Sequence, residues 1–255
     1  ILDGKPPIEK YNILKLRRKK KYVIIKNIKK LEDQIKDCKN LLEKIKINCK
    51  IEALKKKIII ITDSDIKNFK LLLEYLGIPY IQSKTEADFL CNTLYKNKII
   101  SIVISEDTDM LVGGTKRLIK NFNIYSNRVI LFDLDIILKQ LELNKEQWIH
   151  FCILLGCDYC LKIHNFKTND CLELIKTHNI NNIFIKKLNL NKEYICDFTK
   201  AKNLFIKNEK IDENFNENFN EIFNKKPNMS LLIKFLEKNT TLSKKELSYI
   251  LKVFM

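Results

Sequence analysis

The sequence has 255 residues, 45% of them hydrophobic and 31% charged, which is typical of a globular protein with a substantial core. No run of about 20 apolar residues and no signal-peptide pattern occurs, which argues against membrane and secreted classes and predicts an intracellular protein. The net charge is +16, and residues 1–60 contribute +12 of it, with 19 Lys and Arg against 7 Asp and Glu. This excess predicts a polyanionic partner that meets the N-terminal third.

The first part of the chain predicts helices. Residues 11–60 carry apolar side chains at helical spacing in a Lys-rich background, which indicates basic amphipathic helices that bury little by themselves. A solvated helical hairpin without function is the alternative, but the excess of one charge sign favours a binding surface. Leu72, Leu73 and Leu76 belong to a further helix, and Gly77 is suited to end it.

From residue 62 the pattern alternates between helices and strands, which predicts an α/β fold with a mostly parallel sheet. Residues 99–105 form a continuously apolar run, typical of a buried parallel strand. Asn144 and Gln147 form a capping pair at the start of a helix ending near Leu155. The other expected strands are 78–81, 117–121 and 128–132, and the other expected helices are 85–95, 134–141, 168–178 and a closing pair within 227–255.

Two further patterns carry weaker information. The low-complexity segment 213–224 repeats Phe at helical spacing, and a short packed helix or a loop returning to the core is expected there. The eight cysteines are irregularly spaced, and the single C-x-x-C has no second pair, so reduced thiols are expected rather than disulfides or zinc.

The strongest chemical signal is a group of acidic residues after the strand expected at 99–105. Asp107 and Asp109 follow its carboxyl end, where open parallel sheets place their ligand sites. With Glu106 they put three acids within four positions, and such acids repel one another unless a cation is present. Mg²⁺ or Mn²⁺ is the natural cation for an all-oxygen site without a nearby His.

Four further acids are ambiguous when each is considered alone. Thr85 and Asp88 fit a helix capping box, and Glu86 lies in the same first turn, where the helix dipole stabilises acids. Asp158 follows the end of an expected helix, and Asp3 follows what resembles the last residue of a strand. The local pattern at residues 85–88 favours a cap over a metal ligand.

The sequences of four segments, and their order along the chain, resemble the flap endonuclease branch of the XPG-type structure-specific nucleases. These segments are DGKPP, GIPYI with KTEAD, SEDTDML and QWIHFCILLGCDYC, and the likeness extends to AKNLF and PNMSLLIKFL. The resemblance implies a PIN-like nuclease core and six of the family's seven metal-coordinating carboxylates. They correspond to Asp3, Glu86, Asp88, Asp107, Asp109 and Asp158.

Two departures from the family pattern accompany these carboxylates. Asp88 stands where flap endonucleases usually have Glu, although the related exonuclease branch tolerates Asp. The seventh carboxylate belongs to an N-terminal motif upstream of Ile1, so the isolated chain is expected to lack a complete site.

The resemblance also assigns roles to basic residues. Lys10 and Arg17, seven residues and two helical turns apart, correspond to the gateway residues that hold and polarise the scissile phosphate. Residues 18–57 correspond to the arch through which a single-stranded 5′ end is threaded. The DNA-binding residues expected there are Arg18, Lys19, Lys20 and Lys21.

Further along the chain, the family's helical hairpin is built on a Gly-x-Gly turn that binds a monovalent cation and one DNA strand. Asn165, Phe166 and Lys167 fill that turn in this sequence. Binding of potassium is therefore disfavoured, and Lys162 and Lys167 are expected to contact phosphate directly. His150, His164 and His178 lack ligand spacing and are interpreted as surface or satisfied core residues.

The sequence thus predicts a structure-specific 5′ flap endonuclease and 5′–3′ exonuclease of DNA replication and repair. Catalysis is expected to use two Mg²⁺ ions, for which Mn²⁺ can substitute, about 4 Å apart. The expected domains are a nuclease core at 1–160, with the helical arch at about 11–62, and a hairpin DNA-binding region with C-terminal helices at 161–255. The expected partner is branched DNA with a 5′ flap, bound by a monomer in the nucleus or a viral replication compartment.

Two alternatives stay open. One is an exonuclease or junction-resolving member of the same family. The sequence Lys5-Pro6-Pro7 and the long basic insertion favour the flap branch over this alternative. The other is a non-catalytic DNA-binding relative, which six mutually repelling carboxylates disfavour. No sliding-clamp-binding pattern follows at the C-terminus, so a clamp partner is not supported.

Overall fold

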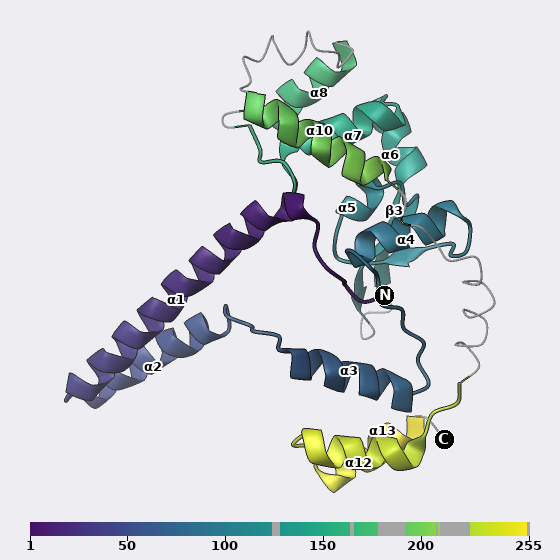
Figure 1. The fold of residues 1–255 in the computed structure, drawn as a ribbon. Coiled ribbons are helices and arrows are strands. Elements are labelled where there is room, and N and C mark those ends of the chain that lie inside the picture. Colours follow the sequence, from purple (N-terminus) through teal and green to yellow (C-terminus); the bar gives the residue numbers. More distant parts are fainter. Residues whose placement is uncertain (124–127, 164–165, 178–191, 208, 210–224, 254–255) are drawn as a thin grey trace. The chain divides into compact units, whose positions relative to one another are not determined.

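The computed structural model describes residues 1–123, 128–163, 166–177, 192–207, 209 and 225–253. The chain divides into two compact units (Figure 1). The first combines Ile1–Tyr11 with Ile81–Asn216, and the second combines Asn12–Tyr80 with Glu217–Met255. Within the described residues, no helix has both the length and the apolar character needed to cross a membrane. The segment 213–224 and the residues His164, Asn165 and His178 lie outside the described part.

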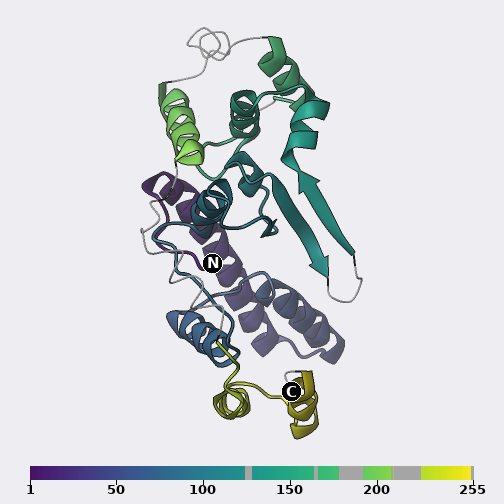
Figure 2. The same ribbon diagram turned by 90° about the vertical axis from the view of Figure 1, so that its right-hand side faces the viewer.

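The sheet of the first unit contains β1 (Val103–Ile104), β2 (Arg117–Asn123) and β3 (Arg128–Asp133), in that order. β1 pairs parallel with β2, and β2 pairs antiparallel with β3 in a long hairpin (Figure 2). The predicted α/β class is confirmed, whereas this three-stranded sheet is mixed rather than mostly parallel. β2 and β3 lie where the sequence predicted strands.

The two other predicted strands are largely absent from the described structure. Of the strand expected at 99–105, only the two residues of β1 form a strand. Residues 78–81 contain no strand, although a parallel bridge joins Leu2 to the neighbouring Gln82. Strand length depends on ladder bonds to neighbours. Within the described residues β1 pairs with a strand on one side only, which explains why so apolar a run forms so short a strand.

The helices of the first unit follow the sequence pattern closely. The expected helices are found as α4 (Ala87–Lys96), α6 (Leu134–Leu141), α7 (Lys145–Leu155) and α8 (Thr168–Thr177), together with α5 (Asp109–Val112), α10 (Lys192–Ile206) and the 3₁₀ helix η1 (Ile8–Lys10). Asn144 and Gln147 form the predicted capping box, in which each side chain bonds the backbone N–H of the other residue.

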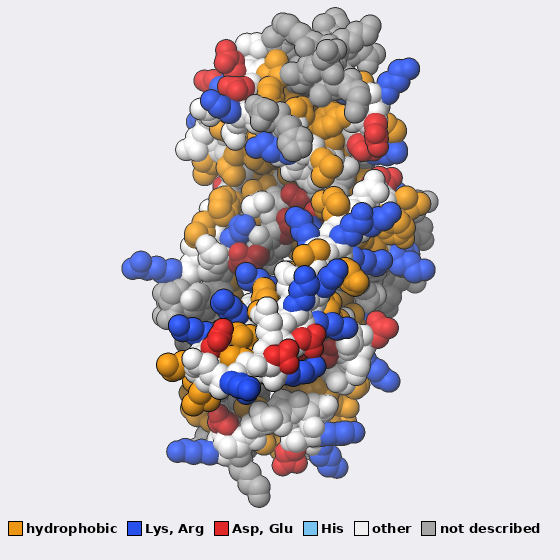
Figure 3. Space-filling model, turned by 90° about the vertical axis from the view of Figure 1, so that its left-hand side faces the viewer, with side chains coloured by type: hydrophobic (Ala, Val, Ile, Leu, Met, Phe, Trp, Pro, Cys, Tyr) orange, Lys and Arg blue, Asp and Glu red, His pale blue; other side chains and the backbone are white. Residues whose placement is uncertain are grey.

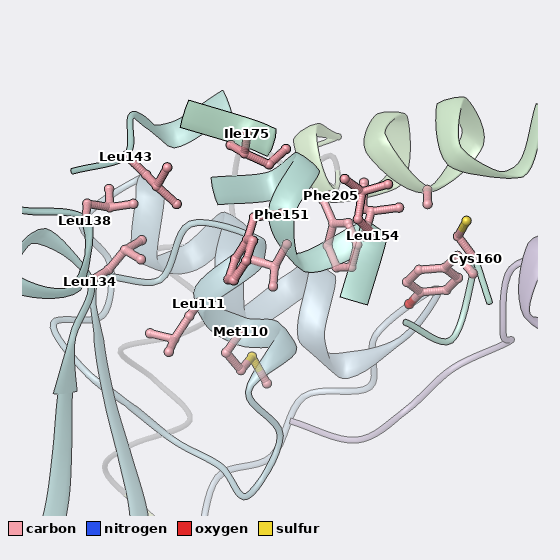
Figure 4. Packing of buried hydrophobic residues seen from close by; sticks show 14 of the residues in the cluster. Met110, Leu111, Leu134, Leu138, Leu143, Phe151, Leu154, Cys160, Ile175 and Phe205 are labelled. Atoms are coloured by element: carbon pink, nitrogen blue, oxygen red, sulfur yellow. The ribbon is translucent and has the colours of Figure 1, made fainter. Parts of the chain in front are cut away.

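A single hydrophobic core supports these elements (Figure 4). Met110 and Leu111 of α5 pack with Phe151 and Leu154 of α7 and with Phe205 of α10. Val103 and Leu118, which pair in register on one face of the sheet, are buried, and α5 contacts both β2 and α7. This packing fixes the turn that follows β1, from which Asp107 and Asp109 project.

The secondary structure of the second unit, among its described residues, consists of helices: α1 (Tyr11–Asp37), α2 (Leu41–Lys55), α3 (Asp63–Tyr75), α12 (Met229–Asn239) and α13 (Lys244–Val253). The basic amphipathic pattern predicted helices here, and α1 and α2 form the two arms of a hairpin (Figure 1). Tyr75 of α3 packs against Phe235 of α12, with ring centroids 5.8 Å apart. α3 ends before Gly77, whose φ of +67° suits glycine, as expected.

Candidate functional site

Two of the predicted carboxylates lie in the turn after β1. Asp107 is exposed and accepts the backbone N–H of Asp109 at 2.9 Å, which shapes the turn into α5. Asp109, the first residue of α5, is half-buried. Glu106 does not join them, because its carboxylate accepts the backbone N–H of Asn121 at 2.8 Å. Asp107 therefore has both a local structural role and a second oxygen left for other contacts.

Glu86 and Asp88 lie at the amino end of α4, and the capping box suggested by their local pattern does not form. Glu86 occupies the N-cap position without a side-chain cap bond, and the Thr85 hydroxyl donates to Glu209 at 3.0 Å instead. The backbone N–H of Ala87 donates to Asp3 at 2.8 Å. Because a distant acid caps this helix, the side chains of Glu86 and Asp88 are not used for capping.

Glu86 is held from two sides. It is only 7% exposed; Lys10 donates to one of its carboxylate oxygens and the hydroxyl of Tyr159 to the other. Lys10 also pairs with Asp158, with 3.0 Å between Nζ and Oδ2. Burial by itself lowers the pKa of Lys10, but the bonds to Glu86 and Asp158 outweigh it and the pKa is raised. Lys10 is therefore firmly cationic beside these two acids.

The remaining carboxylates experience strong mutual repulsion. Burial, followed by the charges of Asp107, Asp3 and Glu86, raises the pKa of Asp88 to about 7. Burial, followed by the charges of Asp107 and Asp158, raises the pKa of Asp109 to about 6. Side chains from the segments after Leu2, before α4, after β1 and after α7 thus lie close enough to act on one another.

The fit of a divalent cation follows from this chemistry. No three His, Cys, Asp or Glu side chains in the described residues are arranged to hold a metal ion as they stand. Lys10 compensates Glu86 and Asp158, whereas Asp88 and Asp109 carry an excess of negative charge. Carboxylate oxygens are the ligands that Mg²⁺ prefers, and its charge would relieve this excess. The donor set fits Mg²⁺ or Mn²⁺.

The predicted basic residues divide between the two units. Lys10 belongs to the first unit, and Arg17, Arg18, Lys19, Lys20 and Lys21 lie on exposed turns of α1 in the second. On the face drawn in Figure 3, Lys and Arg side chains are more common than acidic ones. Lys162 lies beside the turn that carries Asp158, because a Cβ added at Gly156 would come within 2.8 Å of the Cβ of Lys162. Lys167 is exposed just before α8.

Sequence reasoning missed two residues that position the acids. Tyr159 belongs to the segment CDYC and gave no separate signal of its contact with Glu86. Glu209 accepts from the Ser83 hydroxyl at 3.1 Å and from the backbone N–H of Thr85 at 3.1 Å, and its own N–H donates to Thr93 at 2.9 Å. It thereby fixes the loop that leads into Glu86. No local pattern could have predicted a contact over so many residues.

The interpretations of His150 and of the cysteines agree with the structure. His150 is buried against Phe198, and burial followed by the charge of Lys202 lowers its pKa to about 4, so it is a core residue. All eight cysteines are free thiols.

Known proteins resemble this chain in both sequence and fold. Residues 77–158 match the XPG I-region. Flap endonuclease 1-A of Sorghum bicolor is 31% identical over 80% of this chain and 53% of its own length, and flap endonuclease 1 of Cryptosporidium parvum is 32% identical over 84% and 45%. The chain therefore spans about half the length of these relatives.

Solved structures show the same fold. Flap endonuclease-1 from Methanococcus jannaschii aligns with a TM-score of 0.64 and 23% identity over 85% of this chain and 65% of its own. The catalytic core of Rad2 in complex with a DNA substrate aligns with a TM-score of 0.62 and 21% identity, over 99% and 77%.

The chain resembles the XPG family of structure-specific nucleases: its fold is that of their solved structures, and the XPG I-region match spans most of the acids gathered after β1 and at the start of α4. Within that family, the relatives that match its sequence are flap endonucleases.

Proposed function

We propose that this chain acts as a nuclease that hydrolyses phosphodiester bonds in branched DNA with the help of divalent cations. The observation that carries the proposal is the crowding of carboxylates around Asp88 and Asp109, whose pKa values are raised to about 7 and about 6 by burial first and then by the neighbouring negative charges. An acidic cluster of this kind at the end of a strand is suited to binding cations and, through them, phosphate.

Related proteins support the proposal that divalent cations and DNA bind this site. One structure of the related Holliday junction-resolving enzyme GEN1 is a complex with product DNA, Mg²⁺ and Mn²⁺ ions, and it shares the fold with a TM-score of 0.57. By analogy, the residues that would hold the cations are Asp3, Glu86, Asp88, Asp107, Asp109 and Asp158. When bound, two such cations supply an activated water and stabilise the leaving oxygen.

The chain's own residues have distinct roles in this proposal. Tyr159 and Lys10 orient Glu86, and Glu209 anchors the loop before it. The raised pKa of Lys10 keeps its ammonium charged through the physiological range, so it can attract and polarise a phosphate. Arg17, which lies in α1, is proposed to share this role. In this proposal the acids would bind the metal ions, and the cationic side chains would bind the phosphate.

We propose further that the two long helices guide the DNA. α1 and α2 fall within the proposed arch at about 11–62 of a nuclease core at 1–160, and they would accept a single-stranded 5′ end between basic side chains. Lys162 and Lys167, in the hairpin region at 161–255, would bind duplex phosphates. Because phosphate contacts carry no base information, substrate choice would follow DNA shape. The protein would act as a monomer inside the cell, in the nucleus or a viral replication compartment.

A substrate panel tests this function. Cleavage in Mg²⁺ is measured on a 5′-flapped duplex, a plain duplex, a four-way junction and a single strand of matched length. We expect cleavage near the base of the flap, a steep fall of affinity with salt, and indifference to base sequence. Preference for the junction or for the plain duplex end would favour the junction-resolving or the exonuclease alternative.

Two outcomes would contradict the proposal. Tight, shape-selective binding without cleavage under any divalent cation would identify a non-catalytic DNA-binding relative. A DNA affinity that hardly changes with ionic strength would show that phosphate contacts contribute little to binding.

A further inference from the structure

The first unit contains a second concave site, at the opposite end of α4 from the carboxylates. It is a cavity of about 720 Å³ whose apolar lining includes Tyr95, Ile100, Leu134, Trp148, Ile149 and Phe205. α4 has ten residues, so the cavity lies about 15 Å along the helix from Glu86 and Asp88. Its volume lies in the range of ordinary ligand-binding cavities. It is therefore separate from the proposed nuclease site.

The cavity is built into the fold. The backbone of Gly113 lies against Asn92, because an added Cβ would come within 2.0 Å of the Asn92 amide nitrogen. Asn92 is buried and accepts both the backbone N–H and the hydroxyl of Thr115, at 3.1 and 2.7 Å. Trp148 is fixed by donating to the carbonyl of Leu111 at 3.3 Å. These bonds hold the lining in place without a ligand.

The lining is strongly basic. It includes five cationic side chains and, among the described residues that line it, no acidic one; the five are Lys96, Lys98, Lys116, Arg117 and Lys145. Lys116 is paired with Asp135 at 2.6 Å, so part of its charge is already compensated. Burial and the charge of Lys145 lower the pKa of Lys96, so these two ammonium groups are close enough to repel each other. An anion at the rim would relieve that repulsion.

The chemistry favours a peptide over a nucleic acid. The interior is lined by aliphatic and aromatic side chains, and a nucleobase placed there would leave its polar edges without hydrogen-bond partners, which is unfavourable. A Phe, Leu or Trp side chain has few or no such groups and gains from burial. Carboxylates on neighbouring residues would meet the lysines at the rim.

We propose that this cavity is a docking site for an acidic peptide segment of a partner protein, with an apolar anchor inside and Asp or Glu side chains on Lys96 and Lys145.

The test uses the whole chain and a phage-displayed library of random peptides of about 12 residues, at about 0.15 M salt, where the Debye length is about 8 Å. Because the chain carries a net charge of +16, peptides that also bind the double variant Lys96→Glu/Lys145→Glu are first removed. We expect the remaining peptides to combine Asp or Glu with Phe, Leu or Trp. Their affinities are then measured by fluorescence anisotropy.

The control variant matches the test variant in charge and in helix position. Lys238→Glu/Lys245→Glu also changes one lysine in the last turn of a helix and one in the first turn of another, α12 and α13. We expect binding to weaken roughly tenfold or more in Lys96→Glu/Lys145→Glu and to change little in the control. Ser101→Phe, at an exposed position of the lining, should fill the cavity and weaken binding while leaving the fold intact.

Several results would overturn the proposal. One is that no peptide survives the subtraction, or that the survivors lack acidic residues. Another is equal weakening in the test and control variants, which would reveal a general charge effect. A single-stranded oligonucleotide whose binding depends on Lys96, Lys145 and Ser101 in the same way would identify a nucleic-acid site instead.

Discussion

The ammonium nitrogen of Lys10 lies 3.0 Å from a carboxylate oxygen of Asp158 and also donates to Glu86. The Lys10 and Glu86 side chains are only 16% and 9% exposed, so solvent screens this interaction weakly. A cation of the protein itself thus neutralises part of the carboxylate set. If these acids also bind divalent cations, Lys10 and the metal compete for the same oxygens.

Replacing Lys10 with Met tests this competition. We expect the free energy of unfolding without metal to fall by about 2 kcal/mol, less than the ~3–5 kcal/mol lost when a fully buried pair is broken. Apparent Mg²⁺ affinity should rise because the competing ammonium is gone, while cleavage should fall because the phosphate loses a positive partner. Calorimetry and single-turnover cleavage measure these effects. Lys5→Met, at an exposed site, is the control, and equal Mg²⁺ affinities in the two variants would contradict the competition.

The raised pKa values of Asp88 and Asp109 predict how stability depends on pH. Both acids have folded pKa values, about 7 and about 6, above the ordinary value for Asp of about 3.9. The folded state therefore binds more protons than the unfolded state between about pH 4 and pH 7, and stability without metal should fall as pH rises through that window. Melting temperatures at pH 5 and pH 8 in a chelator check this.

Mg²⁺ should reverse that trend by stabilising the protein most at pH 8, where both acids are ionised. Asp88→Asn should flatten the pH dependence because it removes the larger shift. A melting temperature that rises from pH 5 to pH 8 without metal would show that these two acids are not crowded in solution.

The contacts of Glu209 with the loop before α4 predict a stability effect. In Glu209→Ala, the backbone N–H of Thr85 loses one of its two acceptors and the buried Ser83 hydroxyl loses one of its partners. Unfolding free energy should fall by about 1–3 kcal/mol, and Mg²⁺ affinity should fall with it because the loop before Glu86 loosens. Urea denaturation and calorimetry measure both. Glu193→Ala, in the exposed first turn of α10, should change neither, and a loss of stability with unchanged Mg²⁺ affinity would restrict Glu209 to a purely structural role.

The local features of the fold could be predicted from sequence because their causes are local. The capping box of Asn144 and Gln147 lies within four residues, and the ends of α6 and α7 follow from apolar spacing. The short β1 could not be predicted, since strand length depends on neighbours distant in sequence.

The candidate site also contains residues that could be predicted from sequence and residues that could not. Asp107 and Asp109 could be predicted because a strand and the acids after it are contiguous in sequence. It could not be predicted that Glu86 and Asp88 do not cap α4, because the local pattern favours a cap, whereas the observed cap comes from Asp3. The competing partners of Thr85 and Glu86, which are Glu209 and Tyr159, lie more than 70 residues away.

Asp107→Asn separates a structural role of Asp107 from a metal-binding one. Asn keeps an oxygen that can accept the N–H of Asp109 and removes one charge beside Asp88 and Asp109, so the fold should hold or gain stability. Metal affinity should fall, and cleavage by the whole protein should drop on the order of 100-fold or more, while flap binding without metal is kept or improved. Asp107→Ala should also lose about 1 kcal/mol because the turn loses its acceptor. Melting temperature and single-turnover cleavage on both variants decide, and near-normal cleavage by Asp107→Asn would reduce Asp107 to a turn residue.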